Sequence, residues 1–544
     1  MQSLSKSVPT LLLCTLTGFF GSFTAPAQAP GGRVVLVLPF DNRSGDASVS
    51  WIADSFPDTL NKRLASAGFL TISHDDRAFA YDHLGLPADF RPSRATTIRI
   101  AQQLDANFVI IGSYSIKSAS GTASGTPSSN DRIAIQAQVL SLDNLTLTPP
   151  VEDSAELNRL FDAENAIAWK VARLLDPTFT VAEPTFLAAP GAVPLPAFED
   201  YIRGINATTP AERLKHLQAA VAIVPDYAAA LLALGKEQYA AHDYTASAGT
   251  LSRVPPANRL SLEANFYLGL SRFNSASYAA AAQAFEFVAT RLPLPEVVNN
   301  EGVALSRQGK DGAALFQRAA AADPADEDYH YNLGIALYRR GDTAEAIKEA
   351  DDALKLKPTD NEAVALRKQL GLVPAGTRLA PTSTATFTPL ERIRRNYSES
   401  GFRQAAFQLD QMRAARLATL PPDQRALQYT QIGNEYLAQG LLPEAETQFQ
   451  SAIAANPNSA DPHVGLARIR DASSDPAQAR SEANLALKLR PSAAAWMVLA
   501  RLDLAANQLT VCATDVANAL RLEPANTAAQ AMRSALQQRG QSLP

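Results

Sequence analysis

Between residues 33 and 178 the hydrophobic positions predict an α/β domain. The continuous apolar run at residues 34–38 is typical of a strand buried on both faces. Apolar residues then recur every four positions from Ile52 to Leu64, which predicts a helix with one buried face. Residues 132–140 alternate apolar and polar side chains, which indicates a strand with one solvated face. The other expected elements are strands at 69–73 and 107–117 and helices at 93–104 and 154–175.

A stretch rich in Ser, Gly and Thr at residues 118–130 predicts a flexible loop. The strands before and after it are therefore expected to pair as a hairpin. Strands joined by helices and followed by a hairpin suggest an α/β sandwich of modest size. The Pro- and Ala-rich residues 179–194 then predict a linker.

From residue 195 onward the apolar positions have a helical period, and the pattern itself recurs about every 34 residues. Residues 330–341 and 429–440 align without a gap. Both read as an apolar residue and Gly, an aliphatic residue or Tyr three positions on, and a second Gly. Two Ala and a closing Pro follow in each. The later closing prolines, Pro457, Pro491 and Pro524, are 34 and 33 residues apart.

These residues resemble the tetratricopeptide repeat, in which each unit is a pair of antiparallel helices. Because one unit cannot bury its apolar face, the resemblance implies units stacked into a solenoid with a concave side. We expect one array at residues 195–371 and a second at 389–538, with a linker at 372–388 and a tail at 539–544. The predicted fold is an α/β N-terminal domain followed by an all-α solenoid of helix-turn-helix repeats in two arrays.

The resemblance also implies that the first helix of each unit lines a groove. An Asn amide there could donate to and accept from an extended backbone. Tyr would add contact area at little entropic cost, and Arg could hold a carboxylate by two hydrogen bonds. The alternative is that these positions are simply solvated. The candidate groove residues are Phe266, Phe273, Asn299, Arg307, Tyr331, Ile335, Tyr338, Arg339 and Asn434.

The family's carboxylate clamp combines paired Lys or Arg with Asn at fixed positions. We do not find that combination in this sequence, so capture of chaperone carboxyl termini is not expected. Four blocks of the first domain resemble a second family, the TolB-like domains that precede such arrays in many bacterial proteins. The blocks are residues 37–46, 52–60, 104–113 and 133–140. This resemblance implies that residues 30–178 form an envelope-associated interaction domain without catalytic residues.

Residues 1–29 have the pattern of a secretory signal peptide. Lys6 supplies a thin positive region, an apolar stretch follows, and Ala27 and Ala29 form a small-x-small cleavage site. The pattern predicts export to the periplasm or envelope. An uncleaved anchor is one alternative, although the apolar stretch is short and broken for a bilayer span. A lipoprotein signal ending at Cys14 is another, although Leu13 stands where a small residue is expected.

Composition narrows the functional classes. The net charge of −5 argues against a nucleic-acid or anionic-membrane surface, which needs a basic stripe. After cleavage at Ala29 only Cys512 remains, so an intramolecular disulfide is not expected. No metal-binding spacing occurs among the six His, and neither a phosphate loop nor a Gly-x-Ser-x-Gly elbow is present. We therefore expect no enzyme, no cofactor and no metal.

The sequence as a whole predicts an exported scaffold that binds protein or peptide partners through its repeat grooves. It predicts no nucleic-acid partner and no membrane span in the mature chain. One alternative is a structural subunit of an envelope or secretion complex, a homo-oligomer held by edge strands of the first domain. An enzyme would need a site around His74, Asp75, Asp76 and His83, which we interpret instead as a polar surface loop.

Overall fold

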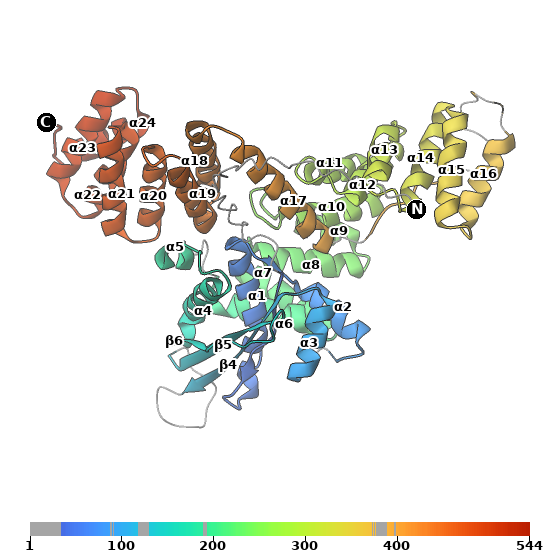
Figure 1. The fold of residues 1–544 in the computed structure, drawn as a ribbon, viewed down its shortest axis with the longest axis horizontal. Helices are drawn as coiled ribbons and strands as arrows, with labels where there is room; N and C mark the ends of the chain where they lie inside the picture. Colours follow the sequence, from blue (N-terminus) through green and yellow to red (C-terminus); the bar gives the residue numbers. More distant parts are fainter. Residues whose placement is uncertain are drawn as a thin grey trace, which may run out of the picture.

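The computed structural model combines a head, built on a β-sheet, with two helical arrays that spread away from it (Figure 1). No described helix is long and apolar enough to cross a membrane. The expected signal peptide, all but the last residue of the expected loop at 118–130, and most of the expected linker at 372–388 lie outside the described residues. The described residues are 34–87, 90, 92–117, 130–188, 193–372, 374, 376, 389–395 and 399–544.

The head contains a six-stranded mixed sheet with the strand order β3-β1-β4-β5-β6, and β2 pairs with β4 beside this path. β1 runs parallel to β3 and β4, whereas β4, β5 and β6 are antiparallel. The pairing of β4 with β5 is the hairpin that the sequence predicts. The strands are β1 (Val34–Val37), β2 (Asp41–Asn42), β3 (Leu70–Thr71), β4 (Phe108–Lys117), β5 (Arg132–Ser141) and β6 (Val151–Glu156).

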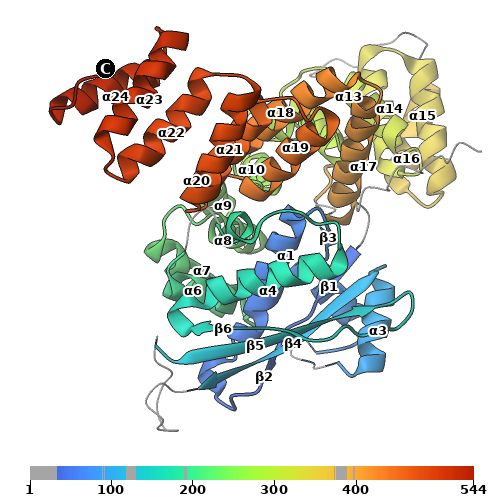
Figure 2. The same cartoon turned by 60° about the vertical axis from the view of Figure 1, so that its left-hand side comes forward.

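Helices cover both faces of this sheet. α1 (Ile52–Ser66) and α4 (Leu160–Leu175) pack on one face, and Figure 2 shows α4 lying across it. α2 (His74–His83) and α3 (Arg94–Gln103) pack on the other. In β1, Val35 belongs to the first core and Leu36 to the second. This division confirms the predicted strand buried on both faces.

Two local predictions were wrong. The helix expected from residue 154 begins at Leu160, because residues 151–156 form strand β6. This strand pairs with β5 and provides hydrogen-bond partners for the backbone N–H and C=O groups of β5 that point away from β4. The polar residues from His74 to His83 form helix α2 and not a loop. Its amino-terminal turn is closed by Ser73, whose hydroxyl accepts a hydrogen bond from the backbone N–H of Asp76.

A buried acid in the head gives a testable pH dependence. Glu164 of α4 is fully buried, and burial raises its pKa to about 7 despite hydrogen bonds donated by Ser55 and Thr59. The folded state then holds a proton that the unfolded state, with its ordinary pKa of 4.5, has released. Stability should therefore fall by about 3 kcal/mol as pH rises from about 4.5 to 7, and stay level above that.

Glu164→Gln should remove this component, because Gln keeps hydrogen-bonding capacity without a charge. Denaturant unfolding of both chains at pH 5 and pH 8 measures it, and all other titrating groups cancel in the comparison. An equal loss of stability in the two chains would contradict the assignment.

The first array contains five helix pairs and a last single helix. Its helices are α6 (Leu195–Asn206), α7 (Pro210–Ile223), α8 (Ala228–Ala240), α9 (Tyr244–Leu251), α10 (Ser261–Asn274), α11 (Tyr278–Ala289), α12 (Pro295–Ser306), α13 (Ala313–Ala322), α14 (Glu327–Arg340), α15 (Thr343–Leu356) and α16 (Asn361–Leu372). The second array contains α17 (Glu399–Ala418), α18 (Pro422–Ala438), α19 (Leu442–Ala455), α20 (Asp461–Ala472), α21 (Pro476–Leu489), α22 (Ala493–Ala505), α23 (Leu509–Leu522) and α24 (Thr527–Gln538).

Close helix packing explains the repeated Gly positions. A Cβ atom on Gly433 would lie 2.7 Å from the ring of Phe449, and one on Gly465 would lie 2.3 Å from it. Phe449 therefore fills the space between two successive units, where only glycine leaves room for the ring. The pair Gly269 and Phe285 repeats this packing in the first array.

Both arrays are joined to the head. In array 1, Phe198 of α6 packs edge-on against Trp51 of the head, and the Tyr201 hydroxyl donates a 2.9 Å hydrogen bond to Asp58. Array 2 docks on α5 (Glu183–Leu187). The expected linker at 179–194 therefore contains a helix that supports the second array. The sequence pattern of this segment did not indicate the helix's role, because its partners in α19 and α20 lie more than 250 residues later in the chain.

Candidate peptide-binding groove

Residues 389–395 do not begin the second array, as their position in the sequence suggested. They lie along array 1 without regular secondary structure and contact α12, α14 and the start of α16. We call the surface formed by these helix segments the groove, and residues 389–395 the strap. The groove residues come from three successive units, so the solenoid itself sets their spacing.

Asparagine side chains hold the backbone of the strap. The Asn332 amide accepts from the N–H of Arg392 at 2.7 Å and donates to its carbonyl at 2.8 Å. Asn300 makes the same pair of bonds with Arg394, both at 2.7 Å, and Asn299 donates to the Arg392 carbonyl at 3.0 Å. All three asparagines are fully buried. Since alternate strap residues are held in this way, the strap binds as an extended chain.

A cationic pocket holds the acidic residue of the strap. The Glu391 side chain is 0% exposed and accepts hydrogen bonds from Arg307 at 3.0 Å, from Arg339 and from Ser306. The same arginines also donate to strap carbonyls, Arg307 to that of Glu391 and Arg339 to that of Pro389, both at 3.2 Å. Two guanidinium groups on one buried carboxylate form a charge-assisted network.

An acidic pocket holds the next residue. Arg392 donates to Asp328 at 2.8 Å, to Asp360 at 2.6 and 2.8 Å, and to Glu362 at 2.7 Å. Its guanidinium carbon lies 3.9 Å from the centre of the Tyr331 ring. Partial burial alone would lower the pKa of Arg392, but these carboxylates outweigh it and raise that pKa. The hydrogen bond from Arg392 likewise lowers the pKa of Asp360.

The last part of the strap continues this alternation. Ile393 packs against the apolar core of array 1. Arg394 forms ion pairs with Asp326 and, at 3.0 Å, with Asp328, and lies 5.4 Å from the centre of the Tyr329 ring. The groove therefore accommodates an acidic, a basic, an aliphatic and a second basic side chain in that order.

The structure brings four of the predicted site residues together around the strap: Asn299, Arg307, Tyr331 and Arg339. Reasoning from the sequence missed Asn300, Asn332 and the acidic pocket. One signal was present, because Asn332 follows Asn300 by 32 residues, the same spacing that separates Arg339 from Arg307, and therefore occupies the same position of the next unit. A search for Asn at that repeat position would have found it.

The other predicted residues lie elsewhere. Phe266, Ile335 and Tyr338 are buried in the packed cores of the repeats. Phe273 is half-buried, with the Arg307 guanidinium carbon 6.0 Å from its ring centre. Asn434 is exposed on α18 in the second array. The predicted first-helix residues thus fall into different environments, because a residue can face the strap, pack against the second helix or face solvent, depending on the side of the helix from which it projects.

The residues weighed as an enzyme site connect the head with array 1. His74 contacts Asp75 at 3.3 Å and Asn206 of α6 at 3.2 Å, and Asp75 pairs with Lys236 of α8 at 2.7 Å. The His74 hydrogen bond, with help from Lys236, holds the pKa of Asp75 well below its usual range. The ring of His83 lies against that of Phe79 in the same helix, with 3.8 Å between the ring centres and 35° between the ring planes. We therefore interpret His74 and Asp75 as residues of a structural contact between the head and array 1.

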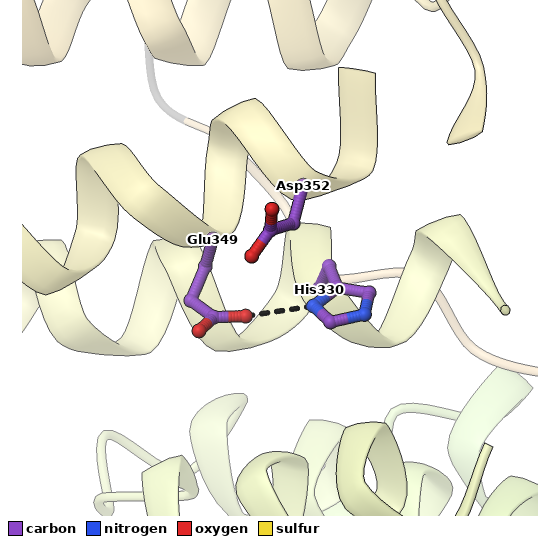
Figure 3. Close-up of side chains that lie close together, drawn as sticks. All are labelled: His330, Glu349 and Asp352. Atoms are coloured by element: carbon purple, nitrogen blue, oxygen red, sulfur yellow. Dashed lines mark hydrogen bonds and ion pairs between the residues drawn. The ribbon is translucent and has the colours of Figure 1, made fainter. Parts of the chain in front are cut away.

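Figure 3 shows one grouping of potential metal ligands among the described residues, His330, Glu349 and Asp352, whose ligand atoms lie within 4.8 Å of one another. Lys348 already pairs with both carboxylates, at 3.1 and 3.3 Å. The His-Glu pair recurs at His463 and Glu482 with the same spacing of 19 residues. We therefore interpret the pair as a feature of the repeat that links its two helices, and assign no metal.

Comparisons with known proteins concern the repeats. Models of the tetratricopeptide repeat match residues 301–361 and 436–502. No curated protein matches the chain. Solved structures that are similar include MamA from Desulfovibrio magneticus RS-1 (19% identity, 31% of this chain and 99% of that chain, TM-score 0.29). YrrB, described as a TPR protein with an unusual peptide-binding site, is similar at 15% identity over 37% of this chain and 98% of that one, with a TM-score of 0.29.

The C-terminal domain of LpoB from Escherichia coli is similar at 19% identity, over 24% of this chain and 85% of that chain, with a TM-score of 0.19. At such scores these likenesses carry no information about ligands or partners. The matches of the repeat models confirm the prediction made from the 34-residue pattern. Both helical arrays of this protein contain tetratricopeptide repeats.

Proposed function

We propose that this protein is an exported scaffold that binds extended segments of polypeptide partners in the groove of array 1. The observation that carries the proposal is the strap, a segment of ordinary polypeptide chain held in that groove by its backbone. Tetratricopeptide repeats are generally binding scaffolds, so the proposal includes no catalytic step.

The chemistry of the groove favours polypeptide over other ligands. Asn300 and Asn332 each offer one donor and one acceptor to the same residue, which matches the N–H and C=O of one residue in an extended chain. The cationic and acidic pockets lie on either side of these amides and suit side chains of both signs. A nucleic acid would meet the acidic pocket unfavourably, because phosphate groups are negative.

The proposed location rests on the sequence. Residues 1–29 have the pattern of a secretory signal, and four blocks of the head resemble TolB-like domains of the bacterial envelope. We propose on these grounds that the head is TolB-like, that the protein acts in the periplasm or envelope, and that its partners are found there.

Binding of an unfolded polypeptide tests the proposed function. The full chain with Glu391→Ala and Arg392→Ala should release the strap and bind a reduced, permanently unfolded carrier protein more tightly than the parent chain does. Adding Asn300→Ala and Asn332→Ala should abolish that gain, because both backbone contacts are lost. We call the chain with Glu391→Ala and Arg392→Ala the strap-free variant, because its groove should be free of the strap. If this variant folds but binds no unfolded polypeptide, the proposed function is contradicted. Arg395→Ala, an exposed arginine of the same strap, is the matched control and should behave like the parent chain.

A further inference from the structure

The groove holds its present occupant through side chains as well as through the backbone, and these side chains define a sequence. Resting on the proposed function, we propose that the groove selects partner segments that carry an acidic residue, Arg, an aliphatic residue and Arg in consecutive positions. The strap is the internal copy of this ligand and competes with the partner for the groove.

The register of a bound chain is fixed by the asparagines. Asn332 and Asn300 hold residues two apart, so the side chains between and before them point to the opposite side. In that register the residue before the first clamp meets Arg307 and Arg339, as Glu391 does. A basic residue there would meet two guanidinium groups without a carboxylate, which excludes it by like-charge repulsion.

The clamped positions themselves select arginine. Arg392 combines bonds to three carboxylates with a stacked Tyr331 ring, and Arg394 combines Asp326 and Asp328 with Tyr329. A planar guanidinium can stack on a ring and donate to several acceptors at once, whereas lysine offers a point charge. The carboxylates of this pocket exclude an acidic residue at either position.

Competition follows from the covalent connection. The strap satisfies Asn299, Asn300 and Asn332 only through its backbone, and any chain of the same pattern would make identical bonds. A tethered ligand acts at an effective concentration of about 1 mM. A partner segment must therefore exceed the strap in local concentration or in additional contacts before it can enter.

A labelled heptapeptide with the sequence of residues 389–395, Pro-Leu-Glu-Arg-Ile-Arg-Arg, tests both parts. The full-chain variant with Glu391→Ala and Arg392→Ala should bind it at least about tenfold more tightly than the parent chain, measured by fluorescence anisotropy. The matched control is Pro-Leu-Arg-Glu-Ile-Arg-Arg, which has the same composition with Glu and the first Arg exchanged. We expect it to bind the strap-free variant at least about tenfold more weakly.

Equal binding of the two peptides would overturn the selection for charge order but leave polypeptide binding intact. Equal binding of the heptapeptide by the parent and the strap-free chain would overturn the competition. If the strap-free variant binds neither peptide, this inference is overturned. Binding of the unfolded carrier protein by the same variant then shows whether the proposed function still holds.

A second measurement needs no substitution and remains decisive if the double variant does not fold. Excess heptapeptide added to the parent chain should raise amide hydrogen exchange in residues 389–395, because the strap is displaced, whereas the exchanged peptide should not. An unchanged exchange rate at a peptide concentration well above about 1 mM would overturn the proposal.

Discussion

Replacing Glu391 by alanine should release the strap and expose it to trypsin, which cuts after arginine at positions 392, 394 and 395. The Glu391 carboxylate is fully buried between two arginines and a serine. Removing one partner of a buried ion pair typically costs about 3–5 kcal/mol, because the remaining charge is left uncompensated. Arg307 and Arg339 keep some contact with water, so we expect a cost of about 3 kcal/mol, which lowers the equilibrium ratio of bound to released strap by about a hundredfold.

Limited proteolysis followed by mass spectrometry measures this release at the level of single cleavage sites. Arg395→Ala removes an exposed arginine from the same segment and should leave cleavage after Arg392 and Arg394 as slow as in the parent chain. If trypsin cuts the strap of the Glu391→Ala chain as slowly as that of the parent chain, the cationic pocket does not hold the strap in place.

The second large effect concerns the attachment of array 2 to the head. Glu446 of α19 is fully buried and accepts two hydrogen bonds from Arg470, at 2.7 and 2.8 Å, and one at 3.1 Å from the backbone N–H of Ala182. Arg470 also donates to the Thr185 hydroxyl of α5. Glu446→Ala therefore leaves a buried arginine unpaired at the junction, and we expect a loss of about 3–5 kcal/mol.

Two measurements separate loss of docking from loss of the array. Denaturant unfolding should show the reduced stability, and small-angle X-ray scattering under native conditions should show a larger radius of gyration as array 2 leaves α5. Thr447→Ala is the matched control on the same helix, because the Thr447 side chain is exposed and its hydroxyl donates to the Pro443 carbonyl within α19. Unchanged scattering and stability in Glu446→Ala would contradict this account of the junction.

The repeats could be predicted because their signals are local. A Gly at the helix contact, an Ala opposite and a closing Pro each reflect packing within one unit, and the unit then recurs. The groove was predicted in part for the same reason. Asn299 and Arg307 in one unit and Tyr331 and Arg339 in the next lie on first helices, and the side of each helix decided which candidates contact the strap.

The strap itself could not be predicted, since its partners are distant in the chain. Glu391 meets Arg307, which lies 84 residues earlier, and nothing in the local pattern around residue 391 indicates that contact. The acidic pocket was missed because Asp328 and Asp360 look like ordinary helix-start residues. Glu446 and Arg470 were missed at the junction for the same reason, because the helix that they hold appeared to belong to a linker.

The central claim is that an extended polypeptide is held in the groove by its backbone, and amide hydrogen exchange tests it most directly. The amides of Arg392 and Arg394 donate to the buried side chains of Asn332 and Asn300. In the parent chain these two amides should exchange far more slowly than free peptide, and the double variant Asn300→Ala with Asn332→Ala should lose that protection. Exchange at the free-peptide rate in the folded parent chain would contradict the claim.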